Sequence, residues 1–401
     1  MTEAPRVRRC FALYFQPEGR SDIDFGALLS GLVPVVRRRI LWALAPHLLE
    51  PVELDTVLGS ALEAVDEKEW VSRSFIEDAI GSPALMQLIE LGLVLEQGIE
   101  TPGFLRDTAL RESHWHPLFA TAHVFSRWSG VDSLRAQEAS DIHSTADLIA
   151  ASGLPPPHYR LRQDALDRIA LEPPQTDGLD ALLHRRTTCR NFDKEAALSA
   201  HGLAVVLHRA FGEQGRQEIE PGAVALKKNH PSGGGLHPLE AYLLVQRVDG
   251  FDPGLYHYNV ESHALDRLPT PHGFDIAAFG RRMVAGQHYF SDAAVLLVVA
   301  VRFPRSFWKY RKHPKIYRAI LIESGHASQN LYLAATELGL GAYVTAAINE
   351  IDIETAFGLD PLLEGPIAVC GFGPRADTRA TVELDPAERV WDASGRLKQS
   401  T

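Results

Sequence analysis

Cysteine is scarce in this sequence, and the few cysteines stand far apart. They are Cys10, Cys189 and Cys370 in a chain of 401 residues, with no Cys-x-x-Cys pair. Disulfide-stabilised proteins and cysteine zinc sites need closer, repeated spacings. The sequence therefore predicts neither a disulfide framework nor a zinc site, and it favours a reducing compartment.

Long hydrophobic runs are also missing. The longest clear run, Ala293 to Val301, falls well short of the roughly 18 apolar residues needed to span a bilayer. The N-terminus shows no apolar stretch followed by a small-residue cleavage site. We therefore expect a cytoplasmic protein with no membrane partner.

Two nucleotide-binding signatures are absent as well. No Gly-x-Gly-x-x-Gly follows a strand pattern, and no glycine-rich loop ends in Gly-Lys-Ser or Gly-Lys-Thr. A Rossmann dinucleotide site and nucleoside triphosphate binding are therefore disfavoured, and a nicotinamide would have to enter as a second substrate.

The charge balance is acidic, with a formal net charge of -11. That sign does not suit a protein whose main role is to neutralise nucleic-acid phosphates, so we expect no nucleic-acid partner. The clearest basic patch is Arg37 to Arg39, which we interpret as the solvated end of a helix and not as a binding face.

The length of the chain predicts two domains, and its composition, 45% hydrophobic and 23% charged, is that of a globular protein. Residues 1–115 are predicted to form a smaller, mainly helical domain, with a helix over Arg39–Ala45, an extended piece over Pro51–Leu54, a helix over Ser82–Leu91 and a strand at Gly92–Leu95. Helix, helix and strand fit either a winged helix or an unspecific helical domain. Its acidic residues favour a peptide or protein partner over DNA; they are Glu63, Asp66, Glu67 and Glu69.

Prolines mark the next stretch as a connector. Residues 116–175 contain Pro155–Pro157 and Pro173–Pro174, which disfavour helix and stiffen the chain. We expect a linker region there.

Stronger signals follow over residues 176–401. Ser199 is predicted to cap a helix that ends at Gly212, and a second helix, carrying Ala327 and Leu331, to end at Gly339. Strands are predicted over Ala241–Val248, Ala293–Val301 and Ile367–Gly371, the second of them central in a sheet covered on both faces. The expected fold class is α+β.

The first candidate site is the segment from His184 to Phe192. If it is extended, alternation puts Arg186, Thr188 and Arg190 on one side, a fork of donors suited to a phosphate and its ribityl chain. A solvated basic turn is the alternative.

The second candidate is the loop from His230 to Pro238, whose centre is Gly233-Gly234-Gly235. Without Cβ atoms the backbone can approach a flat ligand closely. A flexible hairpin loop explains the same residues equally well.

The third candidate is Lys309 with Tyr310, inside an aromatic and basic stretch. A desolvated lysine can act as a base and a tyrosine can relay a proton. Neighbours on a regular helix point apart, so joint action would need an irregular turn. A solvated amphipathic surface is the alternative.

His326 is predicted to be a core histidine. Since no second histidine stands at metal spacing, no metal is expected.

In order and spacing these segments resemble the nitroreductase-like FMN-dependent superfamily, and within it the SagB-type (McbC-like) dehydrogenases of peptide maturation. The resemblance covers about residues 176–375. It is carried by the run from Pro231 to Glu240, by Gly254-Leu255-Tyr256-His257-Tyr258, by Gly325-His326 with Gln329-Asn330, and by Leu338-Gly339-Leu340-Gly341.

The resemblance implies a nitroreductase-like sheet flanked by helices, a homodimer and FMN as cofactor. The residues that it assigns to FMN are Arg186, Thr188, Arg190, Ser232, Gly234, Leu236, Thr345 and Ala346. Thr187 stands where that family has an arginine, which removes one cation from the motif. Lys309 and Tyr310 match the pair implied in catalysis.

The implied activity is FMN-dependent oxidation of azoline rings to azoles in a ribosomally made peptide, with a peptide substrate and a cyclodehydratase as partners. Two alternatives stay open: an NAD(P)H-dependent nitroreductase or quinone reductase, and a non-catalytic flavin-binding scaffold of a modification complex.

Overall fold

The chain forms two compact units. The computed structural model describes residues 4–23, 25–31, 35–160, 162–172, 175 and 177–398. The first unit takes residues 1–127, 302–319 and 360–364, and the second takes 128–301, 320–359 and 365–401. Among the described residues, no helix combines the length and the hydropathy needed to cross a membrane. The division at residues 115 and 175 stays a prediction.

The first unit contains a small antiparallel sheet in the order β5-β1-β6, formed by Val71–Ser72, Arg6–Arg9 and Val94–Glu96. Three short helices pack beside it: α2 (Thr56–Ala61), α3 (Arg73–Ile80) and α4 (Ser82–Glu90). Ile76, Leu85 and Leu88 from these helices are buried in one core with Val7 and Val94 of the sheet. The predicted helix over Ser82–Leu91 and the strand after it are confirmed.

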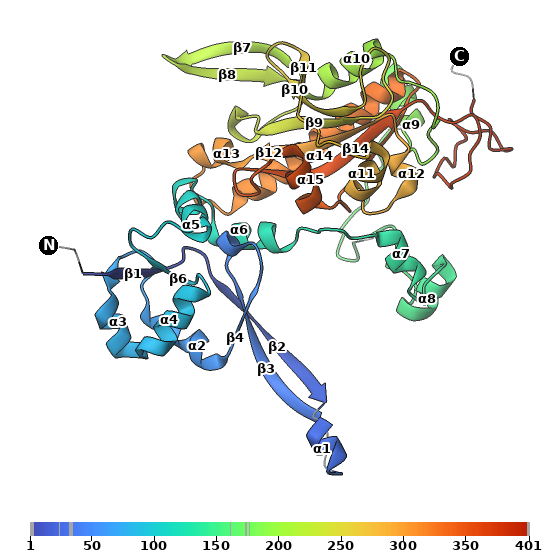
Figure 1. Cartoon of the computed structure of the whole chain (residues 1–401). Coiled ribbons are helices and arrows are strands. Elements are labelled where there is room, and N and C mark those ends of the chain that lie inside the picture. Colours follow the sequence, from blue (N-terminus) through green and yellow to red (C-terminus); the bar gives the residue numbers. More distant parts are fainter. Residues whose placement is uncertain are drawn as a thin grey trace. The chain divides into compact units, whose positions relative to one another are not determined.

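A long hairpin is the feature of this unit that the sequence pattern did not predict. β2 (Tyr14–Ile23) pairs with β3 (Val35–Leu44) from Tyr14 opposite Leu44 to Ile23 opposite Val35, and β3 also pairs with β4 (Val52–Leu54). The hairpin projects away from α2, α3 and α4, with α1 (Phe25–Leu29) at its far end (Figure 1).

The predicted helix over Arg39–Ala45 is therefore wrong, because these residues belong to β3 or follow it directly. Arg37–Arg39 likewise lie in a strand and not at a helix end, and the side chains of Arg37 and Arg38 are outside what the structure describes. Short apolar runs fit helix and strand alike, and here the pairing with β2 decides.

An aromatic core joins distant parts of the chain within the first unit. Trp115 is fully buried, its ring centroid lies 4.6 Å from that of Phe303 and 4.6 Å from that of Phe307, and its indole N–H donates to the carbonyl of Leu362. The helices around it are α5 (Pro102–Glu112), α6 (Pro117–Phe125) and α13 (Phe303–Lys309). The same unit also contains two short 3-10 turns, η1 (Pro46–Leu48) and η2 (Leu62–Ala64).

The predicted connector, residues 116–175, is partly helical. It contains α7 (Ser133–Glu138) and α8 (Thr145–Ser152) besides α6. Asn349 fastens its early part to the second unit's own core by donating to the carbonyl of Val131. Pro155–Pro157 lie in exposed, irregular chain, whereas Pro173 and Pro174 are outside the described residues.

A six-stranded sheet in the order β11-β10-β9-β12-β14-β13 is the framework of the second unit. Its strands are β9 (Leu239–Val245), β10 (Gly254–Asn259), β11 (Ala264–Arg267), β12 (Val295–Arg302), β13 (Gly341–Thr345) and β14 (Glu364–Gly373). A separate hairpin joins β7 (Glu213–Glu220) and β8 (Ala223–Lys228). The three strands predicted for this domain are confirmed.

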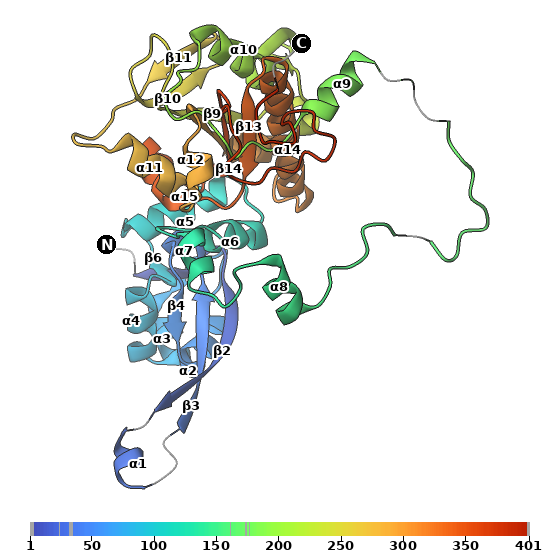
Figure 2. The same cartoon turned by 90° about the vertical axis from the view of Figure 1, so that its right-hand side faces the viewer.

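Helices cover both faces of this sheet. β12 is buried except at Arg302, and its residues Leu296, Val298 and Ala300 share one core with Phe279 and Phe357 of the helices on that face. Those helices are α11 (Ile276–Met283), α12 (His288–Ser291) and α15 (Glu350–Phe357). The long helix α14 (Lys315–Glu337) lies along the other face (Figures 1 and 2), and α10 (Ala200–Phe211) contacts β9.

Helix ends follow the predicted capping. The Ser199 side chain accepts from the backbone N–H of Gly202, and Gly212 ends α10. Gly339 follows α14 with a φ of 73°, a left-handed conformation that suits glycine. These confirmed elements give the α+β fold expected from the sequence.

All three thiols are buried and free of disulfides. Burial raises the pKa of Cys10, Cys189 and Cys370 to about 12. Since the thiolate is the reactive form, the folded protein is expected to resist iodoacetamide at pH 8, whereas all three thiols react after unfolding in guanidinium. Mass spectrometry after timed labelling measures this, and rapid modification of one thiol in the folded protein contradicts it.

Candidate functional site

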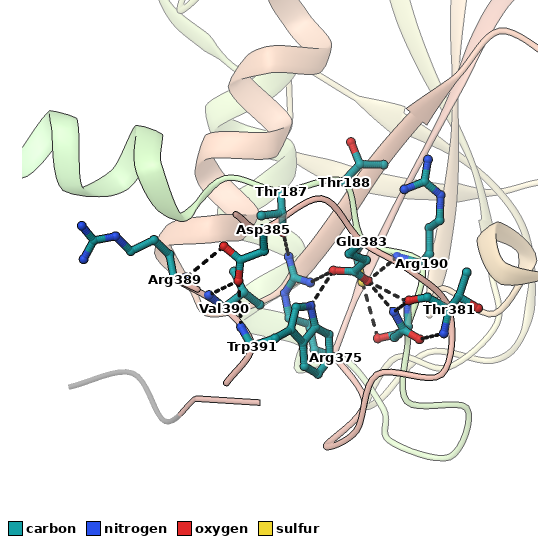
Figure 3. Close-up of polar contacts among 12 residues, drawn as sticks. Thr187, Thr188, Arg190, Arg375, Thr381, Glu383, Asp385, Arg389, Val390 and Trp391 are labelled. Atoms are coloured by element: carbon teal, nitrogen blue, oxygen red, sulfur yellow. Dashed lines mark hydrogen bonds and ion pairs between the residues drawn. The ribbon is translucent and has the colours of Figure 1, made fainter. Parts of the chain in front are cut away.

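Residues 186–190 form an extended segment directly after α9 (Gly178–Arg185). Thr187 and Cys189 are buried, while Arg186, Thr188 and Arg190 are partly exposed. Figure 3 shows Thr188 and Arg190 pointing away from the side on which Thr187 points. The predicted alternation is therefore present, and both arginines lie on its exposed side.

The exposed side of this segment combines cations with aromatic rings. The Arg186 guanidinium lies 5.4 Å from the ring centroid of Tyr332, and that of Arg190 lies 5.9 Å from the ring of Tyr289. The hydroxyls of Thr188 and Tyr332 are 3.0 Å apart, and burial raises the pKa of Tyr332, which keeps the phenol neutral. In the described part of the chain no carboxylate pairs with either arginine, so both cations can face an anion.

The buried side of the segment is held by one carboxylate, that of Glu383. It accepts hydrogen bonds from the backbone N–H groups of Arg190 (2.6 Å) and Asn191 (3.0 Å) and from the Asn191 side chain (2.8 Å). Arg375 (3.1 Å) and the Trp391 indole (2.9 Å) donate to its other oxygen (Figure 3). The C-terminal segment thus fixes the backbone that presents the two arginines.

Thr187 takes part in this support. Its hydroxyl accepts from Arg375 at 3.0 Å, on the side of the segment opposite Arg186 and Arg190. Arg375 forms an ion pair with Glu383, and both side chains are almost fully buried. The resembled family has an arginine where this chain has Thr187. Arg375 lies on the buried side of the segment, so it does not replace that cation on the side of Arg186 and Arg190. Sequence reasoning missed Glu383 and Arg375 because no short motif connects them with Thr187.

The glycine-rich loop is compact and partly open. Its 3-10 turn, η3 (Gly233–Gly235), has positive φ at Gly234 (71°) and Gly235 (69°). A Cβ at Gly235 would meet nothing within 4 Å, and Gly234 is exposed. The Ser232 hydroxyl points into the loop, where it accepts a hydrogen bond from the backbone N–H of His237 (2.8 Å) and donates one to Glu323 (2.6 Å). Leu236 is buried. The exposed part of the loop therefore presents backbone atoms, more than side chains, to a ligand.

Helix α14 connects the two candidate stretches. Tyr332 contacts Thr188, and Glu323 of the same helix holds Ser232 of the loop. These two helix residues are nine positions apart, which is roughly 13.5 Å along the axis and half a turn around it, so their side chains leave opposite sides of the helix. α14 thus supports both stretches, from opposite sides of the helix.

Thr345 and Ala346 lie at the end of β13, beside the arginine segment. Thr188 forms a parallel bridge with Ala342, so both segments run in the same direction. The Thr345 hydroxyl accepts from the N–H of Ala347 at 3.2 Å, and Ala346 is exposed. These residues accordingly lie farther along the chain from the bridge, in the direction in which the arginine segment also runs.

Lys309 and Tyr310 belong to the first unit, unlike the eight residues assigned to FMN, which belong to the second. α13 ends at Lys309, and Tyr310 leaves helical geometry at φ -110° and ψ 51°. The Lys309 Nζ lies 5.6 Å from the Tyr310 ring centroid. The irregular turn needed for joint action is present, but Lys309 is exposed and therefore not desolvated by burial. His326 is exposed too, and not a core residue.

The residues of the second unit fit FMN. Arg186 and Arg190 offer cations for a phosphate, Thr188 lies between them, and the open backbone at Gly235 can face a planar ring system. Bidentate arginine contacts are a common way in which proteins bind a phosphate.

Comparison with known proteins agrees with this geometry. Residues 183–374 match the nitroreductase family, and most of these residues belong to the second unit. More particularly, the chain is similar to two processing proteins. It is 33% identical over 144 residues to the trifolitoxin-processing protein TfxB of Rhizobium leguminosarum bv. trifolii, a match that covers 36% of this chain and 38% of that protein.

The second relative is the microcin B17-processing protein McbC of Escherichia coli, 29% identical over 196 residues, which are 47% of this chain and 67% of that protein. Among solved structures, the E. coli microcin synthetase McbBCD complex with truncated pro-MccB17 bound matches with a TM-score of 0.48 and 23% identity, over 67% of this chain and 98% of the matched chain. The family match and the likeness to the two processing proteins bear out the resemblance seen in the sequence.

Proposed function

We propose that this chain is an FMN-dependent oxidoreductase that oxidises azoline rings to azoles in a ribosomally made peptide. The observation that carries the cofactor is the partly exposed row Arg186, Thr188 and Arg190, whose two cations pair with no carboxylate in the described part of the chain. The likeness to trifolitoxin- and microcin B17-processing proteins supports the peptide substrate.

Bound FMN would supply a two-electron acceptor for the hydride that leaves one ring carbon of the azoline. The neighbouring ring carbon must then lose a proton, which needs a base. We assign this role to Lys309, with Tyr310 as a proton relay beside it. Arg186 and Arg190 would bind the phosphate, and the backbone of Gly233–Gly235 would border the ring system.

The purified protein is expected to be yellow or to take up FMN, with the absorption bands of bound oxidised flavin. It should then convert a synthetic thiazoline peptide to the thiazole with loss of two hydrogen atoms per ring, because the aromatic product drives the reaction. Mass spectrometry of the peptide and the visible spectrum measure this together. A colourless protein that takes up no FMN excludes the proposal.

Lys309→Ala separates this function from the alternatives. It should abolish thiazole formation and leave FMN uptake intact, with the exposed Lys194→Ala as the control. A non-catalytic scaffold would instead support a partner's activity unchanged in the Lys309 variant. An NAD(P)H-dependent reductase would show rapid flavin reduction by the nicotinamide with no peptide present.

A further inference from the structure

Two histidines and a glutamate gather in the interior of the second unit. His230 and His237 stand at the two ends of the glycine-rich loop, and Glu323 comes from α14. All three are buried, and one potential ligand atom from each lies within 4.8 Å of the others. No spacing pattern connects these three residues, because the histidines are seven positions apart and Glu323 follows far along the chain.

The spacing within this cluster is too wide for direct hydrogen bonds. His230 Nε2 lies 3.5 Å and His237 Nδ1 lies 3.7 Å from the same oxygen, Oε1 of Glu323. Hydrogen bonds of this kind are usually about 2.7 to 3.2 Å long. Ligands bound at about 2.0 to 2.1 Å to a tetrahedral zinc ion lie roughly 3.3 to 3.4 Å apart. The observed separations are therefore closer to those around a bound ion.

Hydrogen bonds to the other polar atoms of His230 and Glu323 leave one atom of each side chain available to a metal ion. The His230 Nδ1 lies 3.1 Å from the carbonyl of Ala210, so this nitrogen carries the proton and Nε2 keeps its lone pair. Ser232 donates to Oε2 of Glu323 and leaves Oε1 available. Within the described residues neither His230 Nε2 nor Glu323 Oε1 has a hydrogen-bond partner, although both are buried. Metal ligands are commonly oriented by such outer hydrogen bonds.

We propose that His230, His237 and Glu323 bind a divalent first-row transition metal ion, with zinc as the simplest probe. Two neutral imidazoles and one carboxylate suit such an ion in ligand type and leave a fourth position open. The ion neutralises the buried carboxylate and links the glycine-rich loop to α14. The test of this metal site does not depend on the proposed FMN function.

Zinc binding tests the site directly. Metal-free full-length protein, prepared with a chelator, is expected to retain one zinc ion per chain after dialysis, as measured by elemental analysis. Glu323→Gln and His230→Ala are expected to weaken zinc binding by at least about 100-fold, since even outer-sphere partners contribute 10- to 100-fold. The exposed His201→Ala, on α10, is the matched control and should bind zinc as the parent protein does.

Cobalt substitution provides a second readout that needs no variant. Co²⁺ in the parent protein should give intense visible bands typical of tetrahedral coordination, and zinc should displace them. The site is refuted if the parent protein retains no zinc, or if folded Glu323→Gln, checked by circular dichroism, retains as much as the parent. If that variant does not fold, absent cobalt bands in the parent protein refute it.

Discussion

Replacing Glu383 by leucine is expected to lower the free energy of unfolding by about 3 to 5 kcal/mol, the usual effect of removing one partner of a buried ion pair. The Arg375 guanidinium would stay buried without its carboxylate, and the N–H groups of Arg190, Asn191 and Trp391 would lose their acceptor. Urea denaturation followed by circular dichroism measures the change. The same variant should also bind FMN more weakly, because the backbone behind Arg190 loses its support.

Two further variants show whether the network is the cause. Glu195→Leu, at an exposed position of the same unit, should change stability by no more than about 0.5 kcal/mol. Arg375→Met combined with Glu383→Leu should recover part of the loss, because the uncompensated charge is removed. Equal stability of Glu383→Leu and Glu195→Leu would show that the carboxylate does not support the segment.

The double variant Arg186→Ala/Arg190→Ala is expected to weaken FMN binding by roughly 10² to 10⁴-fold, since each hydrogen bond to a charged group contributes about 1.5 to 3 kcal/mol. Both side chains are partly exposed, so little stability should be lost. Quenching of flavin fluorescence on titration gives the dissociation constants.

Riboflavin, which lacks the phosphate, makes the test specific. Its affinity should be nearly the same for the parent protein and the double variant, whereas the FMN affinity should differ strongly. Arg185→Ala, which removes the neighbouring arginine at the end of α9, is the matched control. A double variant that binds FMN as tightly as Arg185→Ala would rule out the arginine row as the phosphate site.

Much of the second unit could be predicted from the sequence because its signals are local. Local sequence is enough to predict three of its features. They are the apolar run of β12, the Ser199 cap of α10 and the glycine that follows α14. Alternation likewise predicted which side of the 186–190 segment carries the arginines, because the side chains of an extended chain alternate regardless of its surroundings.

Features that depend on distant residues could not be predicted. The sequence pattern predicts a helix over Arg39–Ala45, whereas the strand character of β3 comes from its pairing with β2. The support of the arginine segment depends on Glu383, nearly two hundred positions after Asn191. His230 and Glu323 similarly meet only through the packing of a loop on a helix. Such contacts leave no spacing pattern in a single sequence.

The charge of the 186–190 segment has a consequence for selectivity. In the described part of the chain no carboxylate compensates Arg186 or Arg190, so the segment offers two positive charges that a bound anion can neutralise. If FMN binds as proposed, a flavin without its phosphate would leave both cations uncompensated. The protein would thus discriminate among flavins by their charge before any chemistry occurs.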